Sequence, residues 1–225
     1  YVFFPKMLAG LDSSYTAEGW FRSIAGKEQT MLAVVDSATT RPFLRLELDG
    51  AGVLRWEHRG ADSDASDVVT SRVSHTDGAW HHFAASLDHT DLSMILYVDG
   101  RIVARHTADS VIGEQLAQIV LGKRGASEHS RYFEGRLDDW RLWSTARTRA
   151  DIRRDLDRTL EGDEGGLLAY WKFDEVKGDI VYDLTANDND GLICDVRRDE
   201  FTAPVFVSGV TDTLGNYSIR GIFYG

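Results

Sequence analysis

The chain has 225 residues, 43% of them hydrophobic, so it can bury one sizeable core without forming two full domains. Its formal net charge of −11 creates an acidic field that repels phosphate, which argues against a nucleic-acid-binding protein. No run of about 18 apolar residues occurs, so we expect no membrane insertion. The single cysteine, Cys194, excludes an intrachain disulfide.

Strand patterns separated by turns fill the first part of the chain. Residues 16–22 alternate apolar and polar positions, and residues 31–35 form the continuous apolar run of a strand covered on both faces. Residues 42–48 alternate again, with leucines on one side and charged residues on the other. The pair Asp49 and Gly50 predicts a hairpin turn into the next strand.

The middle of the chain continues in the same way. Residues 80–87 alternate, so His81 and His82 are expected on opposite faces of a strand and cannot jointly bind one metal ion. Asp99 and Gly100 join two further strands, and this dipeptide favours a type I′ hairpin turn.

Residues 135–143 form the most informative strand pattern. Strict alternation predicts one face with Leu137, Asp139, Arg141 and Trp143, and the opposite face with Asp138, Trp140 and Leu142. We expect the tryptophans to close the sandwich and the two adjacent aspartates to emerge at a loop end.

A helix is predicted directly after this strand. Thr148 and Asp151 have the spacing of a capping box, and Ile152, Leu156 and Leu160 form a narrow apolar stripe. The sequence therefore predicts an all-β fold: a two-sheet antiparallel jelly-roll sandwich with one short helix near residues 148–160.

The domain boundary is predicted near residue 200. Residues 1–200 form the sandwich, and residues 201–225 contain a linker and the first strands of a further small β-sandwich that the sequence truncates. Both ends of the chain fall within predicted strands, and no signal peptide precedes the first one. We therefore expect the sequence to be part of a longer multidomain protein.

Five motifs in series resemble the laminin-G-like and pentraxin-like branch of the concanavalin A-like lectin/glucanase superfamily. They occupy residues 78–87, 96–103, 133–143, 166–175 and 183–191. The resemblance implies a binding module of an extracellular or cell-surface protein that recognises carbohydrate or a protein partner beside neighbouring domains of its own chain. The alternative is a spacer with no ligand, because a fold does not by itself imply a function.

A calcium site is predicted in the loop at residues 183–191. The loop gathers many of the oxygen ligands that calcium prefers, although its spacing differs from that of an EF-hand. The resemblance implies a structural calcium held by this loop with an aspartate from the strand at 135–143. The predicted ligands are Asp183, Asn187, Asn189, Asp190, Asp138 and Asp139. On this interpretation a chelator lowers the melting temperature, and Asp183→Ala removes that effect. The alternative is an Asn/Asp-rich turn that needs no ion.

A sugar-binding surface is predicted from aromatic residues. Trp56, His58 and Tyr132 are the candidates for stacking on a sugar, against the alternative that each ring lies in the core. An exposed aromatic beside convergent Asp, Asn or Arg side chains would favour a lectin. A concave face filled by large apolar residues would favour the spacer.

Catalysis is not expected. Glucanases of this superfamily carry two glutamates flanking an aspartate on one strand, and no Glu-x-Asp-x-x-Glu pattern occurs here. The acidic residues at 161–164 have the wrong spacing, and neither a nucleophile motif nor a phosphate-binding loop is present. A glycoside hydrolase is therefore the least favoured of the three functions.

Overall fold

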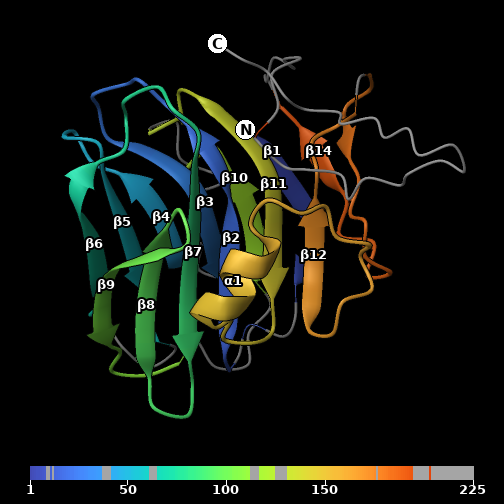
Figure 1. The fold of residues 1–225 in the computed structure, drawn as a ribbon. Helices are drawn as coiled ribbons and strands as arrows, with labels where there is room; N and C mark the ends of the chain where they lie inside the picture. Colours follow the sequence, from blue (N-terminus) through green and yellow to red (C-terminus); the bar gives the residue numbers. More distant parts are fainter. Residues whose placement is uncertain are drawn as a thin grey trace, which may run out of the picture.

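The computed structural model describes residues 1–8, 11, 13–36, 42–60, 65–111, 117–124, 131–175, 177–194 and 203. In these residues the chain forms two antiparallel sheets that lie face to face, with one helix outside them (Figure 1). The predicted β-sandwich with a single short helix is confirmed.

The eight-stranded sheet has the strand order β13-β14-β1-β10-β3-β4-β5-β6. Its strands are β1 (Val2–Leu8), β3 (Gln29–Asp36), β4 (Pro42–Leu48), β5 (Val53–His58), β6 (Asp67–Ser74), β10 (Ala117–Leu121), β13 (Ile180–Val181) and β14 (Gly191–Ile193). The six-stranded sheet has the order β12-β11-β2-β7-β8-β9. Its strands are β2 (Tyr15–Arg22), β7 (His81–Asp88), β8 (Ser93–Val98), β9 (Arg101–Thr107), β11 (Arg136–Trp143) and β12 (Leu167–Trp171).

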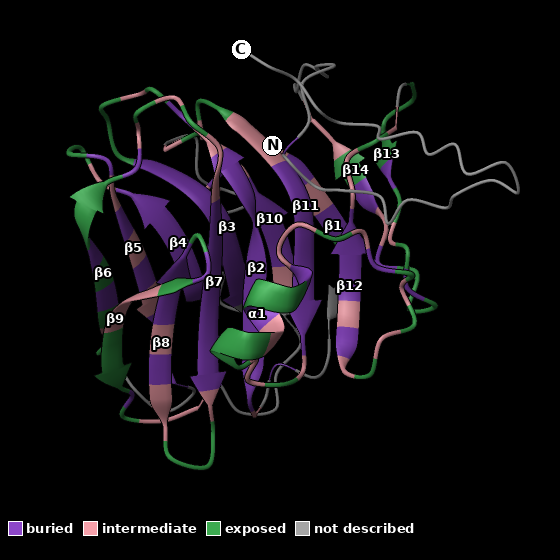
Figure 2. Cartoon of the chain, in the orientation of Figure 1, coloured by how far each residue is buried: buried purple, intermediate pink, exposed green. Residues whose placement is uncertain are grey.

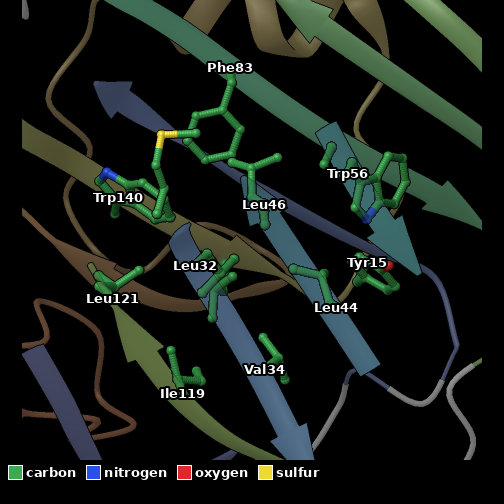
Figure 3. Packing of buried hydrophobic residues seen from close by; sticks show 14 of the residues in the cluster. Tyr15, Leu32, Val34, Leu44, Leu46, Trp56, Phe83, Ile119, Leu121 and Trp140 are labelled. Carbon is green, nitrogen blue, oxygen red and sulfur yellow. The ribbon is translucent and has the colours of Figure 1, made fainter. Parts of the chain in front are cut away.

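The main core lies between the two sheets. Alternate residues of the facing strands fill it, so most strands are buried along their length (Figure 2). Figure 3 shows part of this packing: Leu32 and Val34 from β3, Leu44 and Leu46 from β4, and Trp140 from β11.

The predicted hairpin turns form. Asp99 and Gly100 join β8 to β9 with φ values of 49° and 66°, and positive φ at both central residues is what a type I′ turn requires. The Asp49 side chain closes the β4–β5 turn, because its Oδ1 accepts the N–H groups of Ala51 and Val53.

The helix α1 (Arg149–Asp155) lies on the outer face of the six-stranded sheet (Figure 1). Thr148 caps it and forms the predicted capping box with Asp151, while Ile152 packs against Ala84 and Tyr97. The helix therefore begins where the sequence predicted, but Ile152 is the one member of the predicted apolar stripe that is buried within it.

The helix is shorter than the predicted span of 148–160, because side chains from the sheet take over the carbonyl groups at its end. Trp20 Nε1 donates to Leu156 O at 2.9 Å, and Arg141 Nη1 donates to Asp155 O at 2.8 Å. Leu160 lies beyond the helix, in a separate apolar cluster.

A β-bulge in β11 changes the predicted alternation. The pairing with β2 shifts between Asp138 and Arg141, and Asp139 has φ of 52°. As a result Leu137 and Trp140 both pack against the main core although they are three positions apart. An extra residue in one strand reverses the side-chain order beyond it, which a period-two pattern does not anticipate.

The predicted further domain at 201–225 lies outside the described residues, apart from Ala203. That residue is buried, and its N–H group donates to Asp138 Oδ2 at 2.6 Å.

The two adjacent histidines face opposite sides of β7, as predicted. His82 is buried, and burial lowers its pKa to about 3. His81 instead lies between two carboxylates, with Nδ1 3.0 Å from Asp99 Oδ2 and Nε2 3.2 Å from Asp77 Oδ1. The hydrogen bond to Asp99 raises the pKa of His81.

This arrangement makes part of the stability dependent on pH. A histidine whose pKa is raised in the folded state stabilises the fold fully below its unfolded pKa of about 6.5, and this contribution disappears as the pH rises through the folded pKa. We therefore expect the difference in unfolding free energy between wild type and His81→Gln to be largest at pH 5.5 to 6 and smaller at pH 8. Urea unfolding across this pH range measures it, and a difference independent of pH would contradict the assignment.

Candidate functional site

An open polar pocket of about 320 Å³ lies on the outer face of the eight-stranded sheet. It forms there because Leu44, Leu46 and Leu48 of β4 point into the core, so Arg45 and Glu47 point outward. We call it the arginine pocket, and it is lined by Glu28, Gln29, Arg45, Glu47, Leu48, Asp49, Arg55, Arg124 and Arg131.

Opposite charges face each other across β4 and β5 in this pocket. The register pairs Arg45 with Glu57 and Glu47 with Arg55. Arg55 Nη1 lies 3.1 Å from Glu47 Oε2 and 2.8 Å from Glu57 Oε2. Burial by itself would raise the pKa of Glu57, but the charge of Arg45 and hydrogen bonds to its carboxylate outweigh burial and lower this pKa overall.

Arg131 closes the pocket from a segment that is remote in sequence. Its backbone carbonyl accepts the N–H group of Thr30 at 3.0 Å, which fixes it beside β3. Its side chain pairs with Glu28 at 2.9 Å and lies 3.8 Å from Glu47 Oε1. Glu47 Oε1 in turn accepts the hydroxyl of Thr30 at 2.9 Å.

The carboxylate of Glu47 lies deep in the pocket, and the guanidinium groups of Arg55 and Arg131 lie nearer to solvent. The Glu47 side chain is only 5% exposed, whereas the Arg55 and Arg131 side chains are 31% and 33% exposed. Asp49 belongs to the wall, and its Oδ1 is occupied by the β4–β5 turn. Glu28 is 56% exposed and pairs with Arg131, so a ligand that enters from solvent meets this ion pair and the guanidinium group of Arg55.

Tyr132, a predicted ligand-binding residue, directly follows Arg131 and is 41% exposed. Lys123 holds this ring in place, with its ammonium group 5.6 Å from the centroid of Tyr132 and 4.5 Å from that of Tyr1. Tyr132 is therefore exposed and next to Arg131 in sequence, but it is not one of the residues that line the arginine pocket.

The other two aromatic predictions are corrected. Trp56 and His58 are both 0% exposed and lie in the sandwich, where Trp56 packs near Tyr15 (Figure 3). His58 contacts the Tyr15 hydroxyl at 2.9 Å and the Ser110 carbonyl at 2.7 Å. The reason is register: the even-numbered residues of β5 face inward, so its outward positions are Arg55 and Glu57.

Sequence reasoning missed the arginine pocket, although a signal for it exists. Arg45 and Glu47 alternate with leucines, and Arg55 and Glu57 alternate with Leu54 and Trp56 across the same predicted hairpin. Two complementary Arg-x-Glu pairs on facing strands predict an ionic cluster on one face of the hairpin.

The loop predicted to bind calcium satisfies its central carboxylate with protein donors. Asp183 Oδ1 accepts the N–H groups of Tyr170 and Thr185, each at 2.9 Å. Its Oδ2 accepts the Thr185 hydroxyl at 2.8 Å, and both the backbone and side-chain nitrogens of Asn189 at 3.0 Å. Asp190 Oδ1 accepts the N–H group of Asp183 itself, and Asn187 Nδ2 donates to Leu168 O.

The two aspartates of β11 have partners of their own. Asp139 Oδ1 accepts from Arg141 Nη2 at 2.5 Å and its Oδ2 accepts from the Tyr170 hydroxyl at 3.1 Å. Asp138 accepts from Ala203, and burial raises its pKa to about 7. In this arrangement both carboxylate oxygens of Asp183 and of Asp139 accept protein donors, which a calcium ion bound to them would have to displace. Among the described residues no cluster of three or more acidic, histidine or cysteine side chains has the geometry of a metal site.

Residues 1–153 match the sequence profile of the concanavalin A-like lectin/glucanases superfamily. The chain belongs to this superfamily. The match covers more than half of the sequence and includes every strand that forms the arginine pocket. No curated protein matches the chain.

Solved structures with the same superfamily fold include three informative neighbours. A candidate carbohydrate-binding protein from Bacteroides ovatus has 18% identity and a TM-score of 0.63, covering 85% of this chain and 55% of its own. A heptameric SAP-like pentraxin from Limulus polyphemus has 16% identity and a TM-score of 0.54, with coverages of 68% and 73%. The CBM40 domain of a Ruminococcus gnavus IT-sialidase, bound to α2,3-sialyllactose, has 14% identity and a TM-score of 0.53, with coverages of 64% and 83%.

These similarities establish the concanavalin A-like fold. The chain spans about half the length of the Bacteroides protein. Within the described residues α1, with seven residues, is too short to cross a bilayer, and no membrane-spanning helix occurs.

Proposed function

We propose that this chain is a non-catalytic carbohydrate-binding module and that the arginine pocket receives the sugar. The observation that carries the proposal is an open pocket in which the guanidinium groups of Arg55 and Arg131 are accessible to solvent. The exposed Tyr132 follows Arg131 in sequence. Guanidinium groups donate paired hydrogen bonds to adjacent oxygens, and an aromatic face packs against the C–H surface of a sugar ring. Two neighbours of the same fold have carbohydrate-binding descriptions, which supports this choice of ligand.

The non-catalytic part of the proposal rests on the missing Glu-x-Asp-x-x-Glu pattern and on Glu57, a carboxylate that pairs with the pocket residues Arg45 and Arg55. A glycosidase needs one carboxylic acid with a raised pKa to protonate the leaving group. Glu57 has a lowered pKa because Arg45 lies against it, so it stays ionised. It is therefore suited to orienting arginines and unsuited to donating a proton.

An extracellular or cell-surface location is part of the same proposal. It is supported by the resemblance to laminin-G-like and pentraxin-like domains, and by the pentraxin among the structural neighbours. A structural calcium in the loop at 183–191 stays a prediction from the sequence, and its test is given in the Discussion. Recognition of a protein partner and a ligand-free spacer role are outcomes of the binding test below.

Removing Arg55 should abolish most of the binding. Charge-assisted hydrogen bonds contribute about 1.5–3 kcal/mol each, so Arg55→Ala is expected to weaken glycan binding roughly 10- to 100-fold. A glycan array identifies the ligand, and isothermal titration calorimetry then measures affinity for wild type, Arg55→Ala and Tyr132→Ala. Arg101→Ala is the matched control, because Arg101 is an exposed arginine on the six-stranded sheet.

Circular dichroism melting curves should show that all three variants fold. Loss of binding in Arg55→Ala but not in Arg101→Ala supports the pocket. Equal affinity of all variants would place the ligand elsewhere. A wild-type protein that binds no glycan on the array would contradict the proposed function and favour the spacer.

A further inference from the structure

The arginine pocket offers many donors and few unoccupied acceptors. Arg55 contacts the carboxylates through Nη1, so Nε and Nη2 have no partner among the described residues. Arg45 bonds to Glu57 through Nη2, and its Nε is a buried donor with no partner in the described part of the chain. The Arg45 side chain is only 9% exposed. A buried guanidinium nitrogen without an acceptor is costly, and a ligand oxygen would relieve the cost.

Most acceptors inside the pocket are already in use, and the exposed Glu28 at its entrance pairs with Arg131. Glu47 Oε1 accepts from Thr30 and its Oε2 from Arg55, and Asp49 Oδ1 accepts two N–H groups of the turn. Glu57 Oε2 accepts from both Arg45 and Arg55. Most carboxylate oxygens therefore face protein donors rather than the space that a ligand would occupy.

This excess of hydrogen-bond donors over free acceptors favours an acidic sugar over a neutral sugar as the ligand. Each hydroxyl of a neutral sugar carries a proton that needs an acceptor once it is buried, so a donor-rich pocket satisfies it only in part. An ionised carboxylate is planar and only accepts hydrogen bonds, so its two oxygens match the parallel N–H groups of an arginine guanidinium. The guanidinium groups of Arg55 and Arg131 are accessible to solvent, together with Glu28, which pairs with Arg131, whereas Glu47 is buried.

We infer that the arginine pocket binds an acidic saccharide through the carboxylate of a uronic or sialic acid residue. The carboxylate accepts from the unoccupied nitrogens of Arg55, in the pocket that Arg45 and Arg131 also line. This inference rests on the proposed function and specifies its ligand class. It also explains how a chain with a net charge of −11 would attract an anionic glycan, because the attraction is confined to one arginine-lined patch.

The test compares acidic saccharides with counterparts whose carboxyl groups are neutralised. Calorimetry of the wild-type chain uses an oligogalacturonate and α2,3-sialyllactose, each against its own methyl ester. We expect the acid to bind at least about 10-fold more tightly than its neutral partner in one of the pairs, as charge-assisted hydrogen bonds predict. The preference should shrink when salt rises from 50 to 500 mM, because the pocket is open and screening is effective.

Variants at Arg55 separate the effect of the paired guanidinium N–H groups from the effect of the positive charge. Arg55→Gln should remove the preference for the acid. Arg55→Lys keeps the charge but lacks the paired N–H groups, so it should restore only part of the preference. Arg101→Gln on the other sheet is the control and should leave the preference unchanged. Sulfated saccharides of equal length should bind more weakly than the carboxylates.

The outcomes distinguish the inference from the function it rests on. Neutral saccharides that bind as tightly as the acids, and lose affinity in Arg55→Gln, would overturn the acidic ligand while supporting a carbohydrate-binding module. Sulfated saccharides that bind as tightly as carboxylates would overturn the carboxylate assignment. No binding of any saccharide would contradict the proposed function and the inference with it.

Discussion

Arg141→Met is expected to lower the free energy of unfolding by about 3–5 kcal/mol, because removing one partner of a buried ion pair leaves an uncompensated charge. The Arg141 side chain is only 1% exposed and lies between two buried carboxylates, 2.5 Å from Asp139 Oδ1 and 3.7 Å from Glu18 Oε1. It also donates to the carbonyl groups of Asp155 and Arg158 at the end of α1. The substitution therefore removes the charge balance and the helix anchor together.

Urea unfolding measures this loss, with Arg101→Met as the control at an exposed arginine. Burial already raises the pKa values of Glu18 and Asp139, and without Arg141 these values should rise further. A carboxyl group with a raised folded pKa destabilises the fold as the pH rises, so the loss should be smaller at pH 5 than at pH 8. The double variant Glu18→Gln/Arg141→Met should recover part of the stability. A loss below about 1 kcal/mol would show that the contacts of Arg141 with Glu18 and Asp139 contribute little to the stability of the fold.

Asp183→Ala is expected to cost about 2–4 kcal/mol, because each partly buried N–H donor that loses its acceptor carries a desolvation penalty. The carboxylate accepts from Tyr170, Thr185 and Asn189, and thereby ties the 183–191 loop to β12. Asp183→Asn should cost less, since one side-chain oxygen remains as an acceptor. Asp188→Asn is the control, because Asp188 is exposed and asparagine tolerates its φ of 51°.

The same variants decide whether the loop uses calcium. Hydrogen bonds alone predict equal melting temperatures in EDTA and in millimolar calcium, and the same loss for Asp183→Ala in both. A wild-type melting temperature that falls in EDTA, together with a variant that no longer responds to EDTA, would instead support the calcium site predicted from the sequence. Thermal unfolding in the two buffers separates the alternatives.

Much of the fold was predictable because its signals are local. The alternation of Leu44, Leu46 and Leu48 indicates a half-buried strand, and Asp99 with Gly100 predicts a turn, whatever the distant chain does. The capping box of Thr148 likewise marks where α1 begins. The end of α1 was not predictable, because it depends on Trp20 and Arg141 reaching across from the sheet.

The candidate site was predicted less well than the fold. Tyr132 is exposed and follows the pocket residue Arg131, but Trp56 and His58 belong to the core, and Arg45 and Arg55 of the pocket were not among the predicted residues. Aromatic residues identify sugar-binding surfaces only when they are exposed, and exposure depends on which face of the strand meets the second sheet.

Local sequence patterns were sufficient to establish the strands, the main turns, the start of the helix and the superfamily. Long-range contacts decided the rest: the bulge at Asp139, the donors around Asp183, and the meeting of Arg131 with Arg55 in one pocket. The physical reason is that backbone periodicity and turn preference act over a few residues. Burial, hydrogen-bond satisfaction and charge pairing depend instead on residues that folding brings together from distant parts of the chain.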